Sequence, residues 1–247
     1  MGQSSLNKAH VMDVEIVWKN ALGKPSRLKR NELLIRMTKC SPTDEVVLDI
    51  PFHHQRYDFT CGAACLMMAM KYFDPSIEMN EDLEIDIWRE SNLVEDRATC
   101  GRGLAYSAAK RGYGAKIFAS VDDIPFKDKI LCVSPNADLK VLEFFFRDMK
   151  RRALAMEVPE INKRITFKDA SFAIRRNSVP ILLVNAKFLH DEDVPHWSVV
   201  RGWNRQGVFI NDPMWIVPSA EPIPFTTFMR MIGYGIGQIL IVVFRKN

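Results

Sequence analysis

The sequence lacks the features that mark disulfide-stapled, secreted and membrane-spanning proteins. Its 247 residues include only five cysteines, an odd number in a chain long enough to bury a core, which predicts free thiols and a reducing, cytoplasmic setting. The N-terminus shows no apolar run followed by a small-residue cleavage site, so we expect no secretory signal. Residues 225–244 are apolar, but Arg230, Gln238 and three glycines interrupt them. This pattern favours a final buried strand over 238–244 instead of a membrane span.

The chain also lacks long runs of like charge, internal repeats and low-complexity segments. Its 34 basic and 30 acidic residues are spread along the sequence and leave a formal charge of +4, so we expect no nucleic-acid partner. An apolar content of 47% is enough for one sizeable core. We therefore predict one domain over residues 45–247, preceded by an N-terminal extension of residues 1–44. Neither the role of that extension nor the oligomeric state follows from the sequence.

Within the extension, an alternating run over residues 14–18 and a basic stretch over residues 24–30 indicate an edge strand and a solvated loop. The alternative is an arm that recognises a partner or covers a site.

Apolar periodicity and capping residues predict mostly helices in the first part of the domain and mostly strands in the second. Helices are expected over residues 61–73, 80–91, 103–111, 138–156 and 166–177. Strands are expected over residues 46–50, 115–119, 181–185, 196–203, 208–210 and 238–244. This order indicates an α+β fold with a helical lobe and a strand lobe. A cleft between such lobes would take a nucleophile from one and a base from the other.

Cys61 is the candidate nucleophile because it begins the predicted helix over 61–73. Unpaired backbone amides at a helix N-terminus stabilise a thiolate, and Thr60 occupies the N-cap position. The following Gly62 either leaves room for a substrate carbonyl or reflects tight packing. Gln55, six residues before Cys61, is suited to donate its side-chain amide to a tetrahedral oxyanion, together with the backbone amide of Cys61.

His196 and Asp212 are the candidate base and the carboxylate that orients it. His196 begins one predicted strand and Asp212 follows the next, and a base needs an acceptor that holds its tautomer. A symmetric hairpin about residues 205–206 would pair His196 with Trp215 and Asp212 with Val199, which places the two functional side chains on opposite faces. An offset register or a bulge is therefore required to join them.

Other reactive residues carry weaker signals. Cys100 repeats the local Thr-Cys-Gly sequence of Cys61, but Val94 stands where the glutamine would be needed. Cys65, one helical turn after Cys61, is expected to pack in the core. Trp197 is a candidate for lining a substrate cleft, or for the core.

No metal or cofactor is expected. The pair His53 and His54 with Cys61 and Cys65 lacks a second set of ligands for zinc. His10 and His190, which are isolated in the sequence, are expected on the surface. Cys40 and Cys132 show no sequence pattern that indicates a function.

Two sequence blocks resemble one known family. Residues 55–73, with Gln six residues before Cys and a following Gly-Ala-Ala-Cys-Leu helix, resemble the bacteriocin-processing, double-glycine leader peptidases and their stand-alone relatives among the papain-like cysteine peptidases. Residues 196–203, His-Trp-Ser-Val-Val-Arg-Gly-Trp, and the later Asn-Asp-Pro are similar to the same family's His and Asp blocks. The resemblance implies a papain-like fold, with Cys61, His196, Asp212 and Gln55 as nucleophile, base, orienting acid and oxyanion donor. Thr60 stands where leader-processing members commonly carry Asp, so double-glycine specificity is not carried over.

The function expected from these blocks is hydrolysis of a peptide or isopeptide bond in a peptide or protein substrate, through a thioester on Cys61. The same residues would also support glutamine deamidation or γ-glutamyl transfer, since the covalent step is common to all three reactions. A third possibility is a binding module that keeps the fold without catalysis.

Overall fold

The structure, a computed structural model, describes two short segments near the N-terminus and almost all of the rest. The described residues are 18–19, 25–26, 45–94 and 97–246. The chain divides into two units, Met1–Ser41 and Pro42–Asn247. In the first, β1 (Trp18–Lys19) pairs antiparallel with β2 (Pro25–Ser26). The basic stretch and the alternating run predicted there lie outside the described residues, apart from Trp18, Pro25 and Ser26. The domain boundary after residue 44 stays a prediction.

Eight helices lie in the described part of the second unit. They are α2 (Cys61–Phe73), α3 (Glu81–Ser91), α4 (Gly101–Lys110), α5 (Lys127–Val133), α6 (Leu139–Ala155), α7 (Phe167–Ile174), α8 (Lys187–His190) and α9 (Phe225–Met231). The five predicted helices match α2, α3, α4, α6 and α7. The sequence did not reveal α5, α8 and α9, because helices of seven residues or fewer are too short to show an apolar period.

One sheet holds the strands of this unit in the order β5-β4-β10-β6-β7-β8-β9, with β3 paired to β7. Neighbours are antiparallel except for β4 and β5, which are parallel. The strands are β3 (Val46–Val47), β4 (Tyr113–Ala119), β5 (Glu160–Asn162), β6 (Val179–Asn185), β7 (Pro195–Trp203), β8 (Gly207–Asn211), β9 (Ile223–Pro224) and β10 (Ile239–Arg245).

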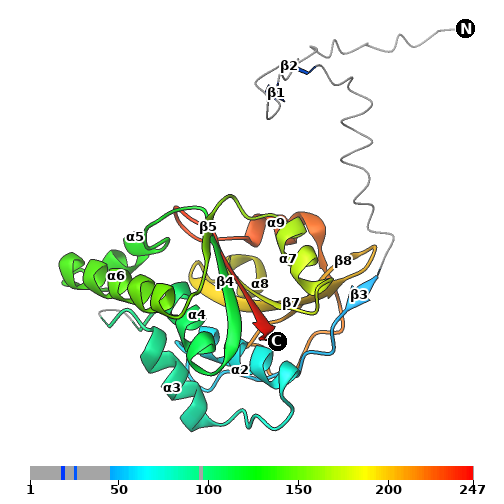
Figure 1. The fold of residues 1–247 in the computed structure, drawn as a ribbon, viewed down its shortest axis with the longest axis horizontal. Helices are drawn as coiled ribbons and strands as arrows, with labels where there is room; N and C mark the ends of the chain where they lie inside the picture. Colours follow the sequence, from blue (N-terminus) through cyan, green and yellow to red (C-terminus); the bar gives the residue numbers. More distant parts are fainter. Residues whose placement is uncertain (1–17, 20–24, 27–44, 95–96, 247) are drawn as a thin grey trace, which may run out of the picture. The chain divides into compact units, whose positions relative to one another are not determined.

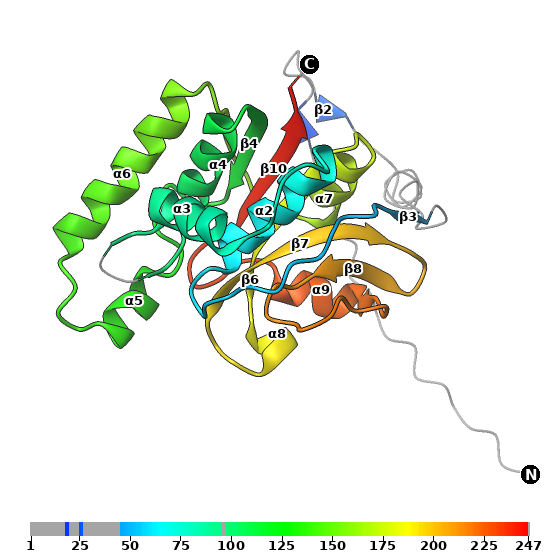
Figure 2. The ribbon, with the colours of Figure 1, turned by 90° about the horizontal axis from the view of Figure 1, so that it is seen from below.

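The strand predicted over residues 115–119 is β4, which lies between α4 and α5 in sequence. It pairs over its whole length with β10, from Ile239 opposite Ala119 to Arg245 opposite Tyr113. Helices α3, α4 and α6 lie together on one side, while β7, β8 and α9 lie on the other (Figures 1 and 2). The α+β class is confirmed, with Cys61 on a helix and His196 on the mainly antiparallel sheet.

The sheet is buried on both faces, which explains the continuous apolar strands. Along β10, the side chains of Ile239, Ile241 and Val243 pack with α2, α3, α4 and α6 in one core. The alternate side chains, Leu240 and Val242, pack with α7 and α9 in a second core. Both faces of the sheet therefore exclude water, and each buried aliphatic side chain contributes about 1.5–3 kcal/mol to folding.

The apolar C-terminal segment forms α9 and β10, which confirms the predicted terminal strand. Among the described residues, no helix combines the length and the apolar character that crossing a bilayer requires.

Candidate active site

Cys61 is the first residue of α2, and this helix is buried almost all round. The Cys61 side chain is only 8% exposed, but it lines a cavity of about 420 Å³ that His196 also lines. The expected N-cap role of the Thr60 side chain is wrong, because Thr60 makes no side-chain hydrogen bond to the helix. Its hydroxyl instead donates to the buried carboxylate of Glu84 in α3. The backbone amides at the start of α2 therefore have no side-chain cap and can stabilise a negative charge on the Cys61 sulfur.

A β-bulge brings His196 and Asp212 to the same face of the sheet. The pairing of β7 with β8 shifts between Val200 and Gly202, so Arg201 is the extra residue. Beyond the bulge, Val199 pairs with Asn211, which places Asp212 opposite Ser198 instead of opposite Val199. His196 lies two residues from Ser198 and therefore on its face. The offset that the sequence required but did not locate is at Arg201.

The three candidate catalytic groups lie together. The His196 Nε2 lies 2.7 Å from the Asp212 Oδ1. Cys61 and His196 line the same cavity, and Cys61 is close enough to the ring to raise the pKa of His196. Since Nε2 faces Asp212, Nδ1 is the ring nitrogen available to the sulfur. Burial by itself lowers the pKa of His196, but the charges of Asp212 and Cys61 outweigh it and raise this pKa to about 10.

Asp212 is fully buried, and its carboxylate contacts four polar groups. Burial raises its pKa, but the charge of His196 and hydrogen bonds from His190, His196 and the Met214 amide lower it below the usual range. The Met214 N–H donates to Oδ1 at 2.9 Å, and the Ser198 hydroxyl lies 3.4 Å from Oδ2. A carboxylate held in this way stays ionised and keeps the His196 ring in one orientation.

His190 is a site residue that the sequence did not identify, and its expected surface location is wrong. Its Nε2 lies 3.0 Å from the Asp212 Oδ2, and its ring meets the His196 ring edge-to-face at 5.8 Å. The short helix α8 after β6 places His190 there, and a helix of four residues is too short to be predicted from apolar periodicity. The closeness of His190 to His196 in sequence, six residues apart, was the only indication that it belongs to the site.

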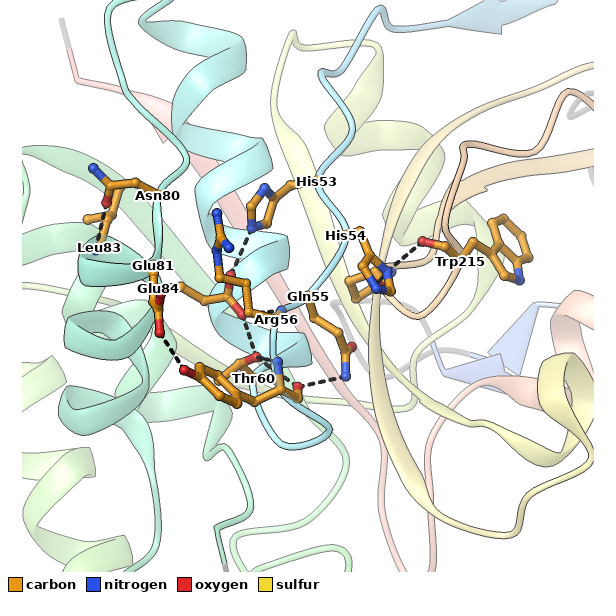
Figure 3. Close-up of polar contacts among 12 residues, drawn as sticks. His53, His54, Gln55, Arg56, Thr60, Asn80, Glu81, Leu83, Glu84 and Trp215 are labelled. Carbon is orange, nitrogen blue, oxygen red and sulfur yellow. Dashed lines mark hydrogen bonds and ion pairs between the residues drawn. The ribbon is translucent and has the colours of Figure 1, made fainter.

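The buried carboxylate of Glu84 holds the loop that leads to Cys61 (Figure 3). It accepts hydrogen bonds from the His53 Nε2 at 2.8 Å, from the Arg56 amide at 2.9 Å and from the Thr60 hydroxyl. Burial raises the pKa of Glu84, but these donors lower it overall. Because one rigid carboxylate binds both ends of the loop, Gln55 is held at a defined position relative to Cys61.

A second set of contacts joins this loop to the segment after Asp212. The His54 Nδ1 lies 2.8 Å from the Trp215 carbonyl (Figure 3), and the backbone N–H of Gln55 donates to the Pro213 carbonyl at 2.9 Å. The Gln55 side chain is buried, with Nε2 donating to the Tyr57 carbonyl at 2.9 Å. One Nε2 hydrogen therefore remains available, while Oε1 has no partner among the described residues.

The two candidate substrate-binding residues lie in different settings. Trp197 lines the Cys61 cavity and donates its indole N–H to the Thr99 carbonyl at 3.2 Å. A Cβ at Gly62 would lie 2.7 Å from the Thr99 Cγ2 and 2.9 Å from a Leu104 methyl. This supports tight packing as the reason for glycine at position 62.

The other cysteines that the structure describes are free thiols. Cys65 is fully buried, and burial raises its pKa well above the ordinary value, in agreement with the expected core role. Cys100 is also buried, with a raised pKa. One ring nitrogen each of His190 and His196 and a carboxylate oxygen of Asp212 lie within 4.8 Å of one another. Both histidines already hydrogen-bond the Asp212 carboxylate.

The charged His196 should make stability pH-dependent. Its pKa is raised from 6.5 to about 10 in the folded protein, so the folded state keeps a proton that the unfolded chain releases. The resulting stabilisation is complete below pH 6.5 and is lost as the pH rises through about 10. Thermal unfolding across this range should show a steeper fall in Tm for the unmodified protein than for His196→Gln. Parallel curves for the two proteins would contradict the raised pKa.

A cysteine at the start of a buried helix, a histidine on a strand and a carboxylate directly after the neighbouring strand are the arrangement expected of a papain-like α+β fold. The chain belongs to the Peptidase_C39 like family, whose profile matches residues 50–244. This confirms the resemblance seen in the Cys and His blocks.

Two solved structures are similar to this chain. One is a double glycine motif protease from an AMS/PCAT transporter, in complex with the leader peptide, at 17% identity and a TM-score of 0.44, covering 83% of this chain and 97% of that one. The other is described as a putative C39-like peptidase from Bacillus anthracis, at 14% identity and a TM-score of 0.39, covering 83% of this chain and 100% of that one. A search of curated proteins found no match. The family assignment therefore rests on the profile.

Proposed function

We propose that this protein is a cysteine peptidase that hydrolyses a peptide or isopeptide bond through a thioester on Cys61. The observation that carries the proposal is the placement of Cys61 and His196 on one cavity, with His196 hydrogen-bonded to the buried Asp212. Charged His196 stabilises the thiolate, and the amides at the start of α2 add to this effect. A cavity of about 420 Å³ at the sulfur gives a substrate access to it.

In the first half of the reaction, the Cys61 thiolate attacks the scissile carbonyl and forms a tetrahedral intermediate. The backbone N–H of Cys61 and the remaining N–H of the Gln55 amide are the proposed oxyanion donors. The contacts of Glu84 and of Pro213 with the loop keep Gln55 in place. His196 then gives its proton to the leaving amine, which leaves an acyl group on the sulfur.

In the second half, His196 takes a proton from water as the water attacks the thioester. Asp212 holds the ring orientation in both halves. The two half-reactions balance with water as the only co-reactant, so the proposal includes no cofactor. We propose a peptide or protein as substrate, with Trp197 lining its cleft and residues 45–247 as the catalytic domain. The four free cysteines among the described residues support the expected cytoplasmic setting.

New N-termini in a cell extract should reveal the substrate class. We expect the purified protein, in reducing buffer, to generate peptide N-termini that are absent when Cys61→Ala is added instead. Intact mass of the enzyme during turnover should show an acyl adduct on Cys61. Glutamine-to-glutamate conversion without new N-termini would instead indicate deamidation, and the absence of any product or adduct would favour the binding module.

A further inference from the structure

The cavity at Cys61 is one of three that are joined by shared lining residues. Phe126 and Lys129 line both the Cys61 cavity and a second cavity of about 320 Å³. Asn185, Tyr234 and Gly235 line both this second cavity and a third of about 540 Å³. The three cavities therefore adjoin one another, from the reactive sulfur, past α5 and the turn before β10, to the far cavity. Such a path is suited to an extended chain, since each of its parts adjoins the next.

Two arginines line the far cavity. Arg164 follows β5, and Arg230 lies in α9, where its guanidinium stacks on Phe188 of α8 at 5.0 Å. The helices α8 and α9 are neighbours (Figure 2). Both side chains are exposed, and neither forms an ion pair with any described residue. Lys127 and Lys150, which line another cavity, differ in this respect, because they pair with Glu143 at 2.9 Å and with Asp122 at 2.6 Å. The two guanidinium groups are thus free to pair with carboxylates from outside the chain.

The charges along these cavities determine where an acidic ligand can lie. The middle cavity is lined by Asp128 and Asp193, which repel carboxylates, and by one cation, Lys129. The Cys61 cavity has mixed charge, and Phe126 and Ile130 provide apolar surface there; its charged residues are Asp58, Arg97, Lys129 and Glu192. Two arginines and no acidic residue line the far cavity, so carboxylates are favoured at that end.

We infer that Arg164 and Arg230 form an exosite for acidic side chains of an extended peptide whose scissile bond lies at Cys61. The inference rests on the proposed function, because it assumes that one peptide occupies both the Cys61 cavity and the far cavity. The substrate class is then a peptide with an apolar residue close to the scissile bond and acidic residues farther along on one side.

Binding to an inactive protein tests the exosite apart from catalysis. The probes are fluorescein-labelled peptides that share a central alanine–leucine segment and carry glutamate, glutamine or lysine on both flanks. In Cys61→Ala at low salt, fluorescence anisotropy should give the glutamate peptide a Kd about tenfold below that of the glutamine peptide, the ratio expected of two exposed charge pairs. The lysine peptide should bind more weakly still, and added salt should remove the preference.

The variant Arg164→Ala/Arg230→Ala, made in the Cys61→Ala protein, should lose this tenfold preference. The matched control is Arg151→Ala/Arg205→Ala, which removes the same charge at exposed positions outside the three cavities. Circular dichroism and Tm confirm that each variant is folded. Equal binding of the glutamate and glutamine peptides, or an equal loss in the control variant, would overturn the exosite.

The two proposals fail separately. If the glutamate peptide binds as expected but the active protein cleaves no peptide, the exosite stands and the peptidase assignment fails. If peptides are cleaved at the same rate whatever their flanking charge, the peptidase stands and the exosite fails.

Discussion

Replacing Cys61 with serine or alanine is expected to reduce kcat by a factor on the order of 10⁴ or more, because the covalent intermediate is lost. The fold should persist, since the sulfur lines a cavity and does not fill the core. Steady-state cleavage of a substrate found by N-terminal profiling measures the first effect, and thermal unfolding measures the second. A large fall in Tm with retained residual activity would show that Cys61 is structural.

Cys65→Ala is the matched control for this change. Cys65 lies one turn farther along α2, is fully buried and donates to the Trp197 carbonyl at 3.3 Å. Its loss should lower Tm by leaving a small void, while kcat per folded molecule is retained. Cys132, which is exposed, serves as a reference thiol within the same chain. Near pH 6, iodoacetamide should modify Cys61 faster than Cys132, and His196→Ala should abolish this difference.

Asp212→Asn is expected to lower kcat by roughly 10²- to 10⁴-fold, because the amide cannot hold the His196 ring in the same tautomer. It also removes the charge that contributes most to raising the His196 pKa. The pH below which the rapid alkylation of Cys61 is lost should therefore move up, since a His196 that holds its proton less tightly stabilises the Cys61 thiolate less. Pre-steady-state rates and the pH profile of alkylation together measure both effects.

His190→Gln tests whether the two carboxylate oxygens of Asp212 have separate roles. This histidine contacts Oδ2, whereas His196 contacts Oδ1. The substitution should reduce kcat much less than Asp212→Asn and should leave the His196 hydrogen bond in place. If His190→Gln were as damaging as Asp212→Asn, then His190 would be needed for the site as a whole, and the simple three-residue site would be wrong.

Features set by neighbours within a few residues could be predicted well. The helix over 61–73 has the expected bounds, because Ala, Leu and Met favour helix and the run is apolar on all sides. The helix expected over residues 166–177 begins at Phe167, where Thr166 and Asp169 form a capping box. The terminal strand β10 also lies where its apolar run placed it, extending by one residue to Arg245.

Features that depend on distant partners could not be predicted. The Thr60 hydroxyl was expected to cap its own helix, but the Glu84 carboxylate, buried by the packing of α3 on α2, takes it instead. His190 was expected to be an isolated surface histidine, but the short helix α8 places its ring against the Asp212 carboxylate. The strand β4 joined a sheet built mainly from the second half of the chain because its apolar side chains are buried against both cores.

The sequence by itself determined the candidate groups and their order along the chain, because Gln55, Cys61, His196 and Asp212 can be picked out by residue type and spacing without a fold. Only the tertiary structure decided that Cys61, His196 and Asp212 lie together. One extra residue at Arg201 shifts the pairing of β7 and β8, and a shift of one residue in a strand exchanges its two faces. Such a bulge cannot be predicted from a local sequence pattern, because its position depends on how the whole sheet packs between its two cores.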